Sequence, residues 1–381
     1  MEPIRMQLNI ELPLDLITLS SVFANNGHRL YLVGGAVRDA ILGRDPKDLD
    51  VATDASPDRI EEILRNSIDA FSAQPTVLPI GKSFGVIRVI FSSGLDIEIA
   101  TFRNDVGSGR RPDAVVFSTI EEDVLRRDLT INALFFDIDA SEVVDFVGGI
   151  ADIRNGVVRS VGSPRERFDE DRLRILRAVR FAAQMGCDLD IETERAIIDD
   201  NRLHQVSPER VREELLKSIS KAHSIVHLVS MVTRLDLWSE VLPGLCVNAA
   251  TVHEIRHPAV LLAFLLRDND VHVLSRRLNE LKFNNDEVRQ ITFLVSFMNL
   301  SIENVLRLRR QFDNSCLERA DVELFSNVVG SPDQRMLNAF MMFNFSVGGQ
   351  LLLDEGFSGR ELGRELERRE IVLFSQILND N

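Results

Sequence analysis

The sequence predicts an α+β protein, in which a small mixed β-sheet with helices forms the N-terminal part and the remainder is all helical. Two patterns predict this fold class. Up to about residue 101, short apolar runs of strand length alternate with amphipathic segments, whereas the second half shows only helical spacing of apolar residues. A length of 381 residues, with 45% apolar and 27% charged residues, suits a globular protein of about two to four compact units.

Local signals place the elements of the N-terminal part. A helix is expected over residues 14–26, because Pro13 suits the first helical turn. Another is expected over residues 59–65, because Ser56 is a good N-cap and a proline follows it. Strands are expected at residues 30–33, 77–80, 86–91 and 95–101.

A Gly-Gly turn follows the first predicted strand. Gly34 and Gly35 separate it from a helix predicted over residues 36–42. Because glycines have no side chain, a phosphate can approach the backbone closely, and the helix start offers it unpaired N–H groups. Arg38 on the first turn adds a charge-assisted contact. Taken alone, an ordinary turn is the commoner explanation of two adjacent glycines.

Two carboxylates, Asp48 and Asp50, come next in a segment predicted to be a strand. Alternate strand residues point to one face, so the two acids repel each other unless a cation lies between them. Oxygen ligands beside a triphosphate suit Mg²⁺. Glu98, on a later strand, is a candidate third carboxylate, and an exposed strand position explains it equally well. A solvated acidic face explains Asp48 and Asp50 taken alone, whereas the neighbouring Gly-Gly turn favours the metal.

An Arg-Arg-Asp cluster precedes a further apolar run. Arg126 and Arg127 are suited to clamping phosphates. Asp128 and Asn132 lie four residues apart on an expected helical face and are suited to holding a ribose. Taken alone, a helix start with surface arginines is the commoner explanation. Before this cluster, residues 103–113 are rich in Gly, Asn and Asp, and we expect a mobile loop there.

Together these motifs resemble those of class II tRNA nucleotidyltransferases and bacterial poly(A) polymerases, in the polymerase-β-like nucleotidyltransferase superfamily. The resemblance runs from about residue 30 to residue 216, with Gly-Gly-x-Val-Arg-Asp, Asp-x-Asp-Val-Ala-Thr and Arg-Arg-Asp-x-Thr-Ile-Asn-Ala in family order. It implies a two-metal nucleotidyl transfer, with Asp48 and Asp50 as metal-binding catalytic residues and Glu98 as a third catalytic carboxylate. It also implies a nucleotide-binding set that includes Gly34, Gly35, Arg38, Arg127, Asp128 and Asn132.

Residues 168–183 are predicted to form one amphipathic helix, on which Asp171, Arg174 and Arg177 share a face. A surface ion pair is the commoner role of such residues. However, a carboxylate that accepts from an amino group, beside a guanidinium that donates to a ring nitrogen, fits cytosine and adenine. Uracil and guanine would leave buried polar groups unpaired, at about 1–3 kcal/mol each. Glu170-Asp171-x-x-Arg174 also resembles the family's nucleobase-reading motif, which implies that Asp171 and Arg174 select CTP and ATP. The implied nucleotide-binding set thus extends to Asp171, Arg174, Arg177 and Arg180.

The remainder is predicted to be helical and, by the resemblance, to hold tRNA. The resemblance implies a catalytic head over residues 1–150, a base-recognising neck over 151–222, and a helical body and tail over 223–381. Arginines within residues 356–369 are candidate contacts to RNA phosphates, and a solvated helix is an equal alternative. Helices are expected at residues 190–200, 207–222, 225–234, 259–267, 271–281, 286–299 and 302–312.

Charge and composition limit the partners. A net charge of −15 gives no overall attraction to nucleic acid, so RNA binding requires a local basic surface. The 3 cysteines lie far apart in the sequence, which favours a reducing compartment. The first ten residues lack the apolar core of a signal peptide, and no apolar run has spanning length. We therefore expect a cytoplasmic protein that does not bind a membrane and has no obligate protein partner, and the resemblance implies tRNA 3′ ends, CTP and ATP as its substrates.

Three functions fit these motifs. CCA addition to tRNA is favoured over ATP-only tailing by a poly(A) polymerase, because residues 81–85 carry one basic residue where the resembling poly(A) signature has two. An enzyme that adds only CC or only A stays open, since that distinction depends on the loop 103–113. A non-enzymatic RNA-binding relic is disfavoured, since a binding module has no need of a paired carboxylate metal site.

Overall fold

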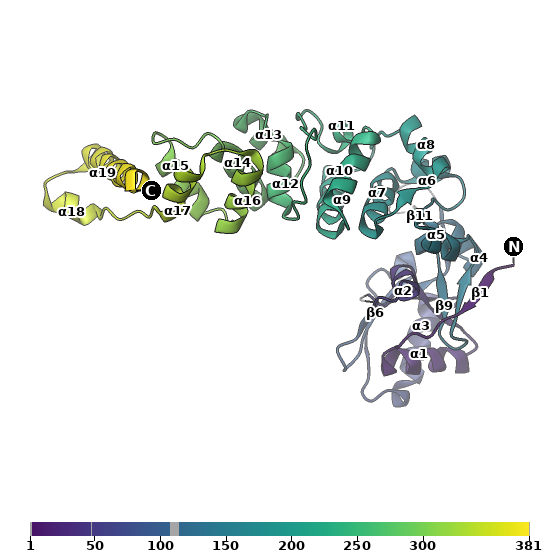
Figure 1. Ribbon diagram of the computed structural model, residues 1–381. Coiled ribbons are helices and arrows are strands. Elements are labelled where there is room, and N and C mark those ends of the chain that lie inside the picture. The colour runs from purple at the N-terminus through teal and green to yellow at the C-terminus, as the bar shows by residue number, and fades with distance from the viewer. Residues whose placement is uncertain (1, 47, 107–113, 381) are drawn as a thin grey trace. The chain divides into compact units, whose positions relative to one another are not determined.

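A mixed β-sheet forms the centre of the first of two structural units. A computed structural model describes residues 2–46, 48–106 and 114–380, and the chain divides into Met1–Val206 and Ser207–Asn381. Among the described residues the main sheet has eight strands, of which β3 and β6 pair in parallel and the other neighbours pair antiparallel. The α+β expectation is therefore confirmed. In sheet order, the strands are β1 (Ile4–Gln7), β10 (Glu142–Asp145), β9 (Phe135–Asp137), β2 (Leu30–Val33), β3 (Val51–Thr53), β6 (Asp96–Thr101), β5 (Val86–Ile90) and β4 (Thr76–Leu78) (Figure 1).

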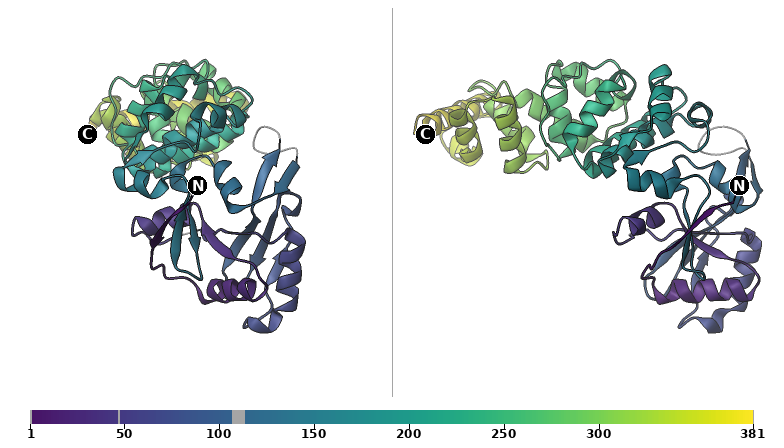
Figure 2. Two further views of the ribbon diagram at one scale, coloured as in Figure 1. Left: turned by 90° about the vertical axis from the view of Figure 1, so that its right-hand side faces the viewer. Right: turned by 45° about the vertical axis from the view of Figure 1, so that its right-hand side comes forward.

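Three early helices pack on this sheet, as the views in Figure 2 show. Helices α1 (Leu14–Asn25) and α2 (Gly35–Ile41) contact β2, and α3 (Pro57–Asn66) contacts β5. The predicted cap of α3 is present, because the side chain of Ser56 accepts a hydrogen bond from the N–H of Arg59 at 3.3 Å. The later helices of this unit are α4 (Ile120–Leu125), α5 (Gly149–Asn155), α6 (Pro164–Glu170), α7 (Leu173–Met185) and α8 (Ile191–Asp199). The neck expected over residues 151–222 is not all helical, because the short strands β11 (Val157–Val158) and β12 (Asp188–Leu189) pair in parallel there.

A buried aromatic core holds together the strands that carry the predicted site. Tyr31, Phe102 and Phe135 lie with ring centroids 5.9–6.1 Å apart, in edge-on or tilted contact. Val33 of β2, Ala52 of β3 and Val124 of α4 belong to the same core. Because Gly34, Asp50 and Arg127 follow or precede these core residues by a few positions, the core fixes their backbones. It comprises the buried residues Val33, Ala52, Phe102, Val124, Ala133, Phe135, Val144 and Val161.

Two local expectations about the site segments are wrong. Strand β3 begins at Val51, so Asp48 and Asp50 precede the strand instead of lying in it. Asp128 and Asn132 do not share a helical face, because Asp128 lies outside the 3-10 turn η3 (Thr130–Asn132). The chain then enters β9 and β10, which the sequence analysis did not predict. Pairing of β9 with both β2 and β10 explains this, since sheet pairing overrides local helical preference.

The single helix expected over residues 168–183 is two helices. α6 ends at Glu170 and α7 begins at Leu173, with Asp171 extended at φ −151° and ψ 104°. The Asp171 side chain explains the break, because its Oδ1 accepts a hydrogen bond from the N–H of Leu173 at 3.1 Å.

The expected loop at residues 103–113 is flanked by an unpredicted hairpin. Strand β7 (Arg103–Val106) pairs antiparallel with β8 (Ala114–Phe117). Residues 107–113 lie outside the described residues, so the expected mobility there stays a prediction.

The second unit is helical throughout its described residues, as expected. Helix α12 (Pro258–Leu265) packs against α14 (Asn285–Phe297) and α16 (Arg319–Val329), and its residues 259–265 are all buried. The rings of Phe297 and Phe340 lie 4.9 Å apart within an aromatic cluster. The other helices are α9 (Pro208–Lys221), α10 (Ile225–Arg234), α11 (Trp238–Val241), α13 (Val271–Glu280), α15 (Val305–Asp313), α17 (Gln334–Met342), α18 (Gly349–Asp354) and α19 (Gly359–Asp380).

Across the described residues, none of the helices combines the length and apolar character that crossing a membrane requires.

Candidate active site

The turn between β2 and α2 has a backbone conformation that is accessible to glycine, at Gly34. Gly34 has φ +66° and ψ −125°, a region that residues with a Cβ rarely adopt. A Cβ built on Gly34 would lie 3.7 Å from the carbonyl oxygen of Asn132 and 3.8 Å from Nη1 of Arg127. The turn therefore lies directly beside the Arg-Arg-Asp segment, although the two are almost a hundred residues apart in the sequence.

Arg38, on α2, is buried and holds this junction together. Its Nη1 donates to Oδ1 of Asn132 at 2.6 Å, and its Nη2 donates to Oδ1 of Asp39 at 2.8 Å. The side chain thus supports Asn132 from within the fold, besides placing a positive charge near the turn. The next glycine, Gly35, is the first residue of α2, and a Cβ there would lie 3.5 Å from Nη2 of Arg38.

Asn132 has an unused hydrogen-bond donor. The residue is 8% exposed, and its Nδ2 is buried with no partner among the described residues. A buried donor without a partner costs about 1–3 kcal/mol. A substrate oxygen beside Asn132 would remove that cost, which fits the sugar-binding role that the resemblance implies.

Three carboxylates lie on two adjacent segments of the sheet, since Asp48 and Asp50 precede β3 and Glu98 lies on β6. Val51 lies opposite Ile99 in the parallel β3–β6 register, so the preceding Asp50 falls opposite Glu98. Lost hydration raises the pKa of Asp50, and the negative charges of Glu98 and Asp48 raise it further, while Arg127 acts in the opposite direction. All three acidic residues are exposed.

This acidic cluster fits a divalent cation. Carboxylates that repel one another gain from a cation between them. Within the described residues, no three or more His, Cys, Asp or Glu side chains form a group that could enclose a metal ion. An open pair such as Asp48 and Asp50 suits Mg²⁺, which takes one or two carboxylates and completes its shell with water and phosphate oxygens.

Arg126 and Arg127 are fixed by a buried acid that the sequence analysis missed. Asp123 is 1% exposed, and it accepts from Arg126 Nη2 at 2.6 Å and from Arg127 Nη2 at 2.9 Å. Burial opposes the ionisation of Asp123, but Arg127 and Arg126 outweigh it and lower its pKa. The spacing of three and four residues to the arginines was the available signal.

Asp128 is paired with an arginine of α7. Its Oδ2 accepts from Nε of Arg177 at 2.6 Å, and its Oδ1 accepts from the N–H of Leu129 at 2.9 Å. Burial favours the neutral acid, yet Arg177 and these hydrogen bonds lower the pKa of Asp128. The pair therefore fastens the Arg-Arg-Asp segment to α7.

The two residues expected to select the nucleobase have distinct partners. Nη1 of Arg174 donates to Oε2 of Glu170 at 2.5 Å, and its Nη2 donates to the carbonyl oxygen of Arg126 at 3.0 Å. The side chain of Asp171 accepts a hydrogen bond from the N–H of Leu173, the first residue of α7. Asp171 lies between α6 and α7, whereas Arg174 lies in the first turn of α7. The two residues therefore do not share the helical face that we predicted.

Phe181 of α7 is a further residue that the sequence analysis missed. Its ring lies 4.0 Å from the guanidinium of Arg180, 5.0 Å from that of Arg38 and 5.6 Å from that of Arg177. Three predicted nucleotide-binding arginines thus share one aromatic neighbour. In the sequence, Phe181 resembles any other apolar residue of an amphipathic helix.

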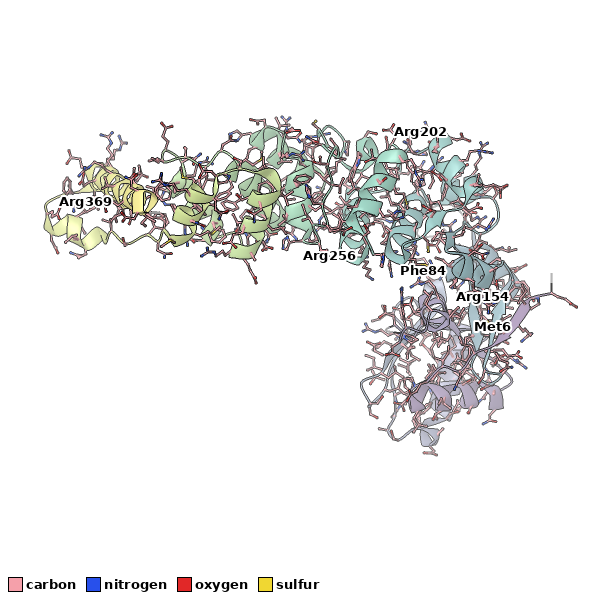
Figure 3. The ribbon with its side chains drawn as sticks, in the orientation of Figure 1. Met6, Phe84, Arg154, Arg202, Arg256 and Arg369 are labelled. Atoms are coloured by element: carbon pink, nitrogen blue, oxygen red, sulfur yellow. The ribbon has the colours of Figure 1, made fainter. Side chains whose placement is uncertain are left out.

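The arginines near the C-terminus are engaged in ion pairs. Arg369, labelled on α19 in Figure 3, pairs with Glu355 and Glu365. Arg368 also pairs with Glu365, at 2.7 Å, and the two arginines lower the pKa of Glu365 to about 2. This pairing supports the solvated-helix alternative for these two arginines.

Comparison with known families defines the class of protein. Residues 30–159 match the Poly A polymerase head domain, and residues 186–247 match the family described as the probable RNA and SrmB-binding site of polymerase A. The first match covers β2, the Gly-Gly turn, all three acidic residues and the Arg-Arg-Asp segment. The chain is therefore a nucleotidyltransferase.

Curated relatives narrow the class. A CCA-adding enzyme of Lactobacillus helveticus is 30% identical over 383 residues, covering 93% of this chain and 91% of that protein. A CCA-adding enzyme of Bacillus subtilis is 43% identical over 223 residues, covering 57% of this chain and 52% of that protein. This chain belongs to the family of CCA-adding enzymes.

Solved structures of CCA-adding enzymes share the fold of this chain. The Bacillus stearothermophilus CCA-adding enzyme in complex with CTP has a TM-score of 0.70 at 25% identity, covering 96% of this chain and 92% of that chain. A Thermotoga maritima CCA-adding enzyme complexed with tRNA-CCA has a TM-score of 0.70 at 19% identity, covering 99% of this chain and 98% of that chain. The second comparison concerns the fold alone.

Proposed function

We propose that this protein adds C, C and A to the 3′ ends of tRNA, using CTP and ATP and no nucleic-acid template. The observation that carries the proposal is the placement of Asp50, which lies opposite Glu98 in the β3–β6 register and whose carbonyl oxygen accepts from the N–H of Val33 at 3.0 Å, next to the Gly-Gly turn and Arg127. The family membership, and the related CCA-adding enzymes that were solved in complex with CTP, ATP and tRNA, support the substrates.

Asp48 and Asp50 are the proposed Mg²⁺ ligands, with Glu98 as a third catalytic carboxylate. The bound cation would lower the pKa of the attacking 3′-hydroxyl and neutralise charge on the triphosphate. Gly34 and Gly35 leave room for the phosphates, and Arg127 faces the same space. Asn132, with its free Nδ2, and Asp128 are proposed to hold the sugar. These groups orient the α-phosphate for in-line attack, and pyrophosphate leaves.

Asp171 and Arg174 are the proposed readers of the base. A carboxylate acceptor and a guanidinium donor match the amino group and ring nitrogen that cytosine and adenine present. Arg174 is held by Glu170 and by the carbonyl oxygen of Arg126, so its direction is fixed before a nucleotide binds. Arg177 and Arg180 lie beside it on α7 and contribute positive charge.

The test is a nucleotide-addition assay. Purified protein with Mg²⁺ is incubated with a tRNA transcript that lacks CCA, with CTP, ATP or both, and products are resolved to single nucleotides. We expect two additions with CTP alone and three with both nucleotides.

A different product would change the assignment. A long ladder with ATP alone would establish ATP-only tailing, the activity that the name of the matched head domain suggests. Extension that stops at CC with both nucleotides, or that adds A only to a transcript ending in CC, would establish a partial enzyme. No extension under any condition would refute the proposed activity.

A further inference from the structure

Arg172 lies at the α6–α7 break, between the two proposed base-reading residues, and the proposed function gives it no role. Its side chain is 10% exposed. Nη2 lies 2.5 Å from Oδ1 of Asp169 on α6 and 2.9 Å from Oδ2 of Asp200, the residue that follows α8. Nη1 donates to the carbonyl oxygen of Asp200 at 3.3 Å. One guanidinium therefore joins α6, the break and α8.

An arginine at this position is unfavourable for the local helix. Arg172 occupies the N-cap of α7, where the helix dipole disfavours a cation and a short polar side chain is preferred. Its Nε is also buried with no partner in the part of the chain that the structure describes. Such a donor costs about 1–3 kcal/mol. The contacts to Asp169 and Asp200 must offset both costs.

The cavity beside Arg172 does not point to an anionic ligand. It measures about 400 Å³ and is lined by Arg165 and Arg172 but also by Asp169, Asp199 and Asp200. Asp199 pairs with Arg165, and Asp200 pairs with both Arg172 and Arg202. The acidic residues outnumber the arginines, and an added anion would be repelled. The role of Arg172 is therefore best explained by the segments of the chain that it connects.

The contacts of Arg172 hold the backbone on either side of this residue in place. Asp171 directly precedes it in an extended conformation, and the carbonyl oxygen of Asp171 accepts from the N–H of Arg174 at 2.9 Å. A shift of the break would therefore turn the Asp171 carboxylate and move the first turn of α7 together. Because hydrogen-bond selection requires a fixed direction of donor and acceptor, such a shift would weaken discrimination between bases.

We propose that Arg172 is a positioning residue for nucleobase selection, which fastens the α6–α7 break to α8 and so fixes the directions of Asp171 and Arg174. This inference rests on the proposed function of the same site. Arg172 touches neither the nucleotide nor the acidic cluster in this role. Its loss therefore relaxes base choice more than it slows the reaction with the correct base.

The experiment compares Arg172→Ala and Arg172→Lys with Arg202→Ala in the full chain. Arg202 pairs with the same Asp200, at 2.7 Å, but its side chain is 69% exposed and it follows α8 (Figure 3). Each variant is given tRNA lacking CCA with CTP or with UTP, and kcat and KM are measured for both. For Arg172→Ala we expect the preference for CTP over UTP to fall about tenfold, mostly through KM. Arg172→Lys should recover part of the preference, and Arg202→Ala should match the natural protein.

Other outcomes overturn the inference. Equal losses with CTP and UTP, in step with a lower unfolding temperature, would show a merely structural role. An unchanged preference in Arg172→Ala would refute the inference, and Arg172→Gln provides the same readout if the alanine variant does not fold. Failure of the natural protein to add C or A would instead refute the proposed function, and this inference with it.

Discussion

At the residue scale, the surroundings of Asp50 favour the proposed cation-binding role over a role in stability. Lost hydration and the charges of Glu98 and Asp48 raise its pKa, so the folded protein keeps like charges together. Such repulsion is common at functional sites, where stability is given up for activity. Nearby Asp96 differs, because it pairs with Arg88 through two hydrogen bonds and its pKa is lowered.

Glu98 and Asp96 lie on the same face of β6 and allow a matched test. We expect Glu98→Gln, like Asp50→Asn, to lower kcat at least about a hundredfold, because it removes a negative charge that is proposed to help hold the Mg²⁺. Asp96→Asn should keep kcat within about threefold, because Asp96 pairs with Arg88 and is not one of the proposed catalytic carboxylates, although Arg88 also lies opposite Glu98 in the β5–β6 register. Nucleotide addition under saturating CTP and Mg²⁺ is the measurement.

Thermal unfolding of the same variants provides the control. Glu98→Gln should unfold at the same or a higher temperature, because it removes a repulsive charge. If Glu98→Gln retains full kcat, Glu98 is only an exposed strand residue and the third-carboxylate assignment is wrong.

At the element scale, the sequence predicted elements whose signals are local. The strand–turn–helix around Gly34 and the capped helix α3 lie where expected, because the glycines, Ser56 and Pro57 act within a few residues. Strands β1, β9 and β10 were missed, because their pairing depends on partners far away in the chain. The break before α7 was missed because it depends on one side-chain hydrogen bond from Asp171.

The sequence predicts candidate site residues, but not the residues that support them. Charged residues at family spacings predict Asp48, Asp50, Arg127 and Asp128 as candidates. The role of Asp123 could not be predicted, since the sequence does not show that it alone among the acidic residues of α4 is buried. Phe181 carried no signal that separates it from the apolar face of its helix.

The helix α4 and its arginines give a prediction about stability. We expect Asp123→Asn to reduce the free energy of unfolding by about 3 kcal/mol at pH 7, because it leaves Arg126 and Arg127 without their buried partner. The pKa of Asp123 is lowered in the folded state, so its stabilisation is full above the unfolded pKa of about 4. It is lost as the pH falls below that value through the folded pKa.

Urea unfolding of both proteins at several pH values between about 7 and 3 tests this sign. The difference between Asp123→Asn and the natural protein should be constant down to about pH 5 and shrink below pH 4. Glu122→Gln, on the exposed face of the same helix, is the control and should change stability little. A difference that grows on acidification would contradict the direction of the pKa shift.

At the scale of the whole molecule, the residues proposed for catalysis lie in one of two structural units. All residues proposed for the metal, the nucleotide and the base lie in Met1–Val206. The Ser207–Asn381 unit instead has an aromatic core, in which Phe340 lies 4.9 Å from Phe297, 6.0 Å from Phe312 and 6.5 Å from Phe293. Each unit has its own buried core, which is the condition for separate unfolding.

The division predicts that a core substitution affects one unit only. Phe340→Ala should reduce the stability of the second unit by about 3–5 kcal/mol, because it removes a fully buried ring. Scanning calorimetry should then show one transition moved to a lower temperature and the other unchanged. Met342→Ala, at a 56% exposed position of the same helix α17, should move neither. If Phe340→Ala lowers both transitions together, the two units unfold as one cooperative structure, and the stability of the nucleotide site depends on the helical half of the chain.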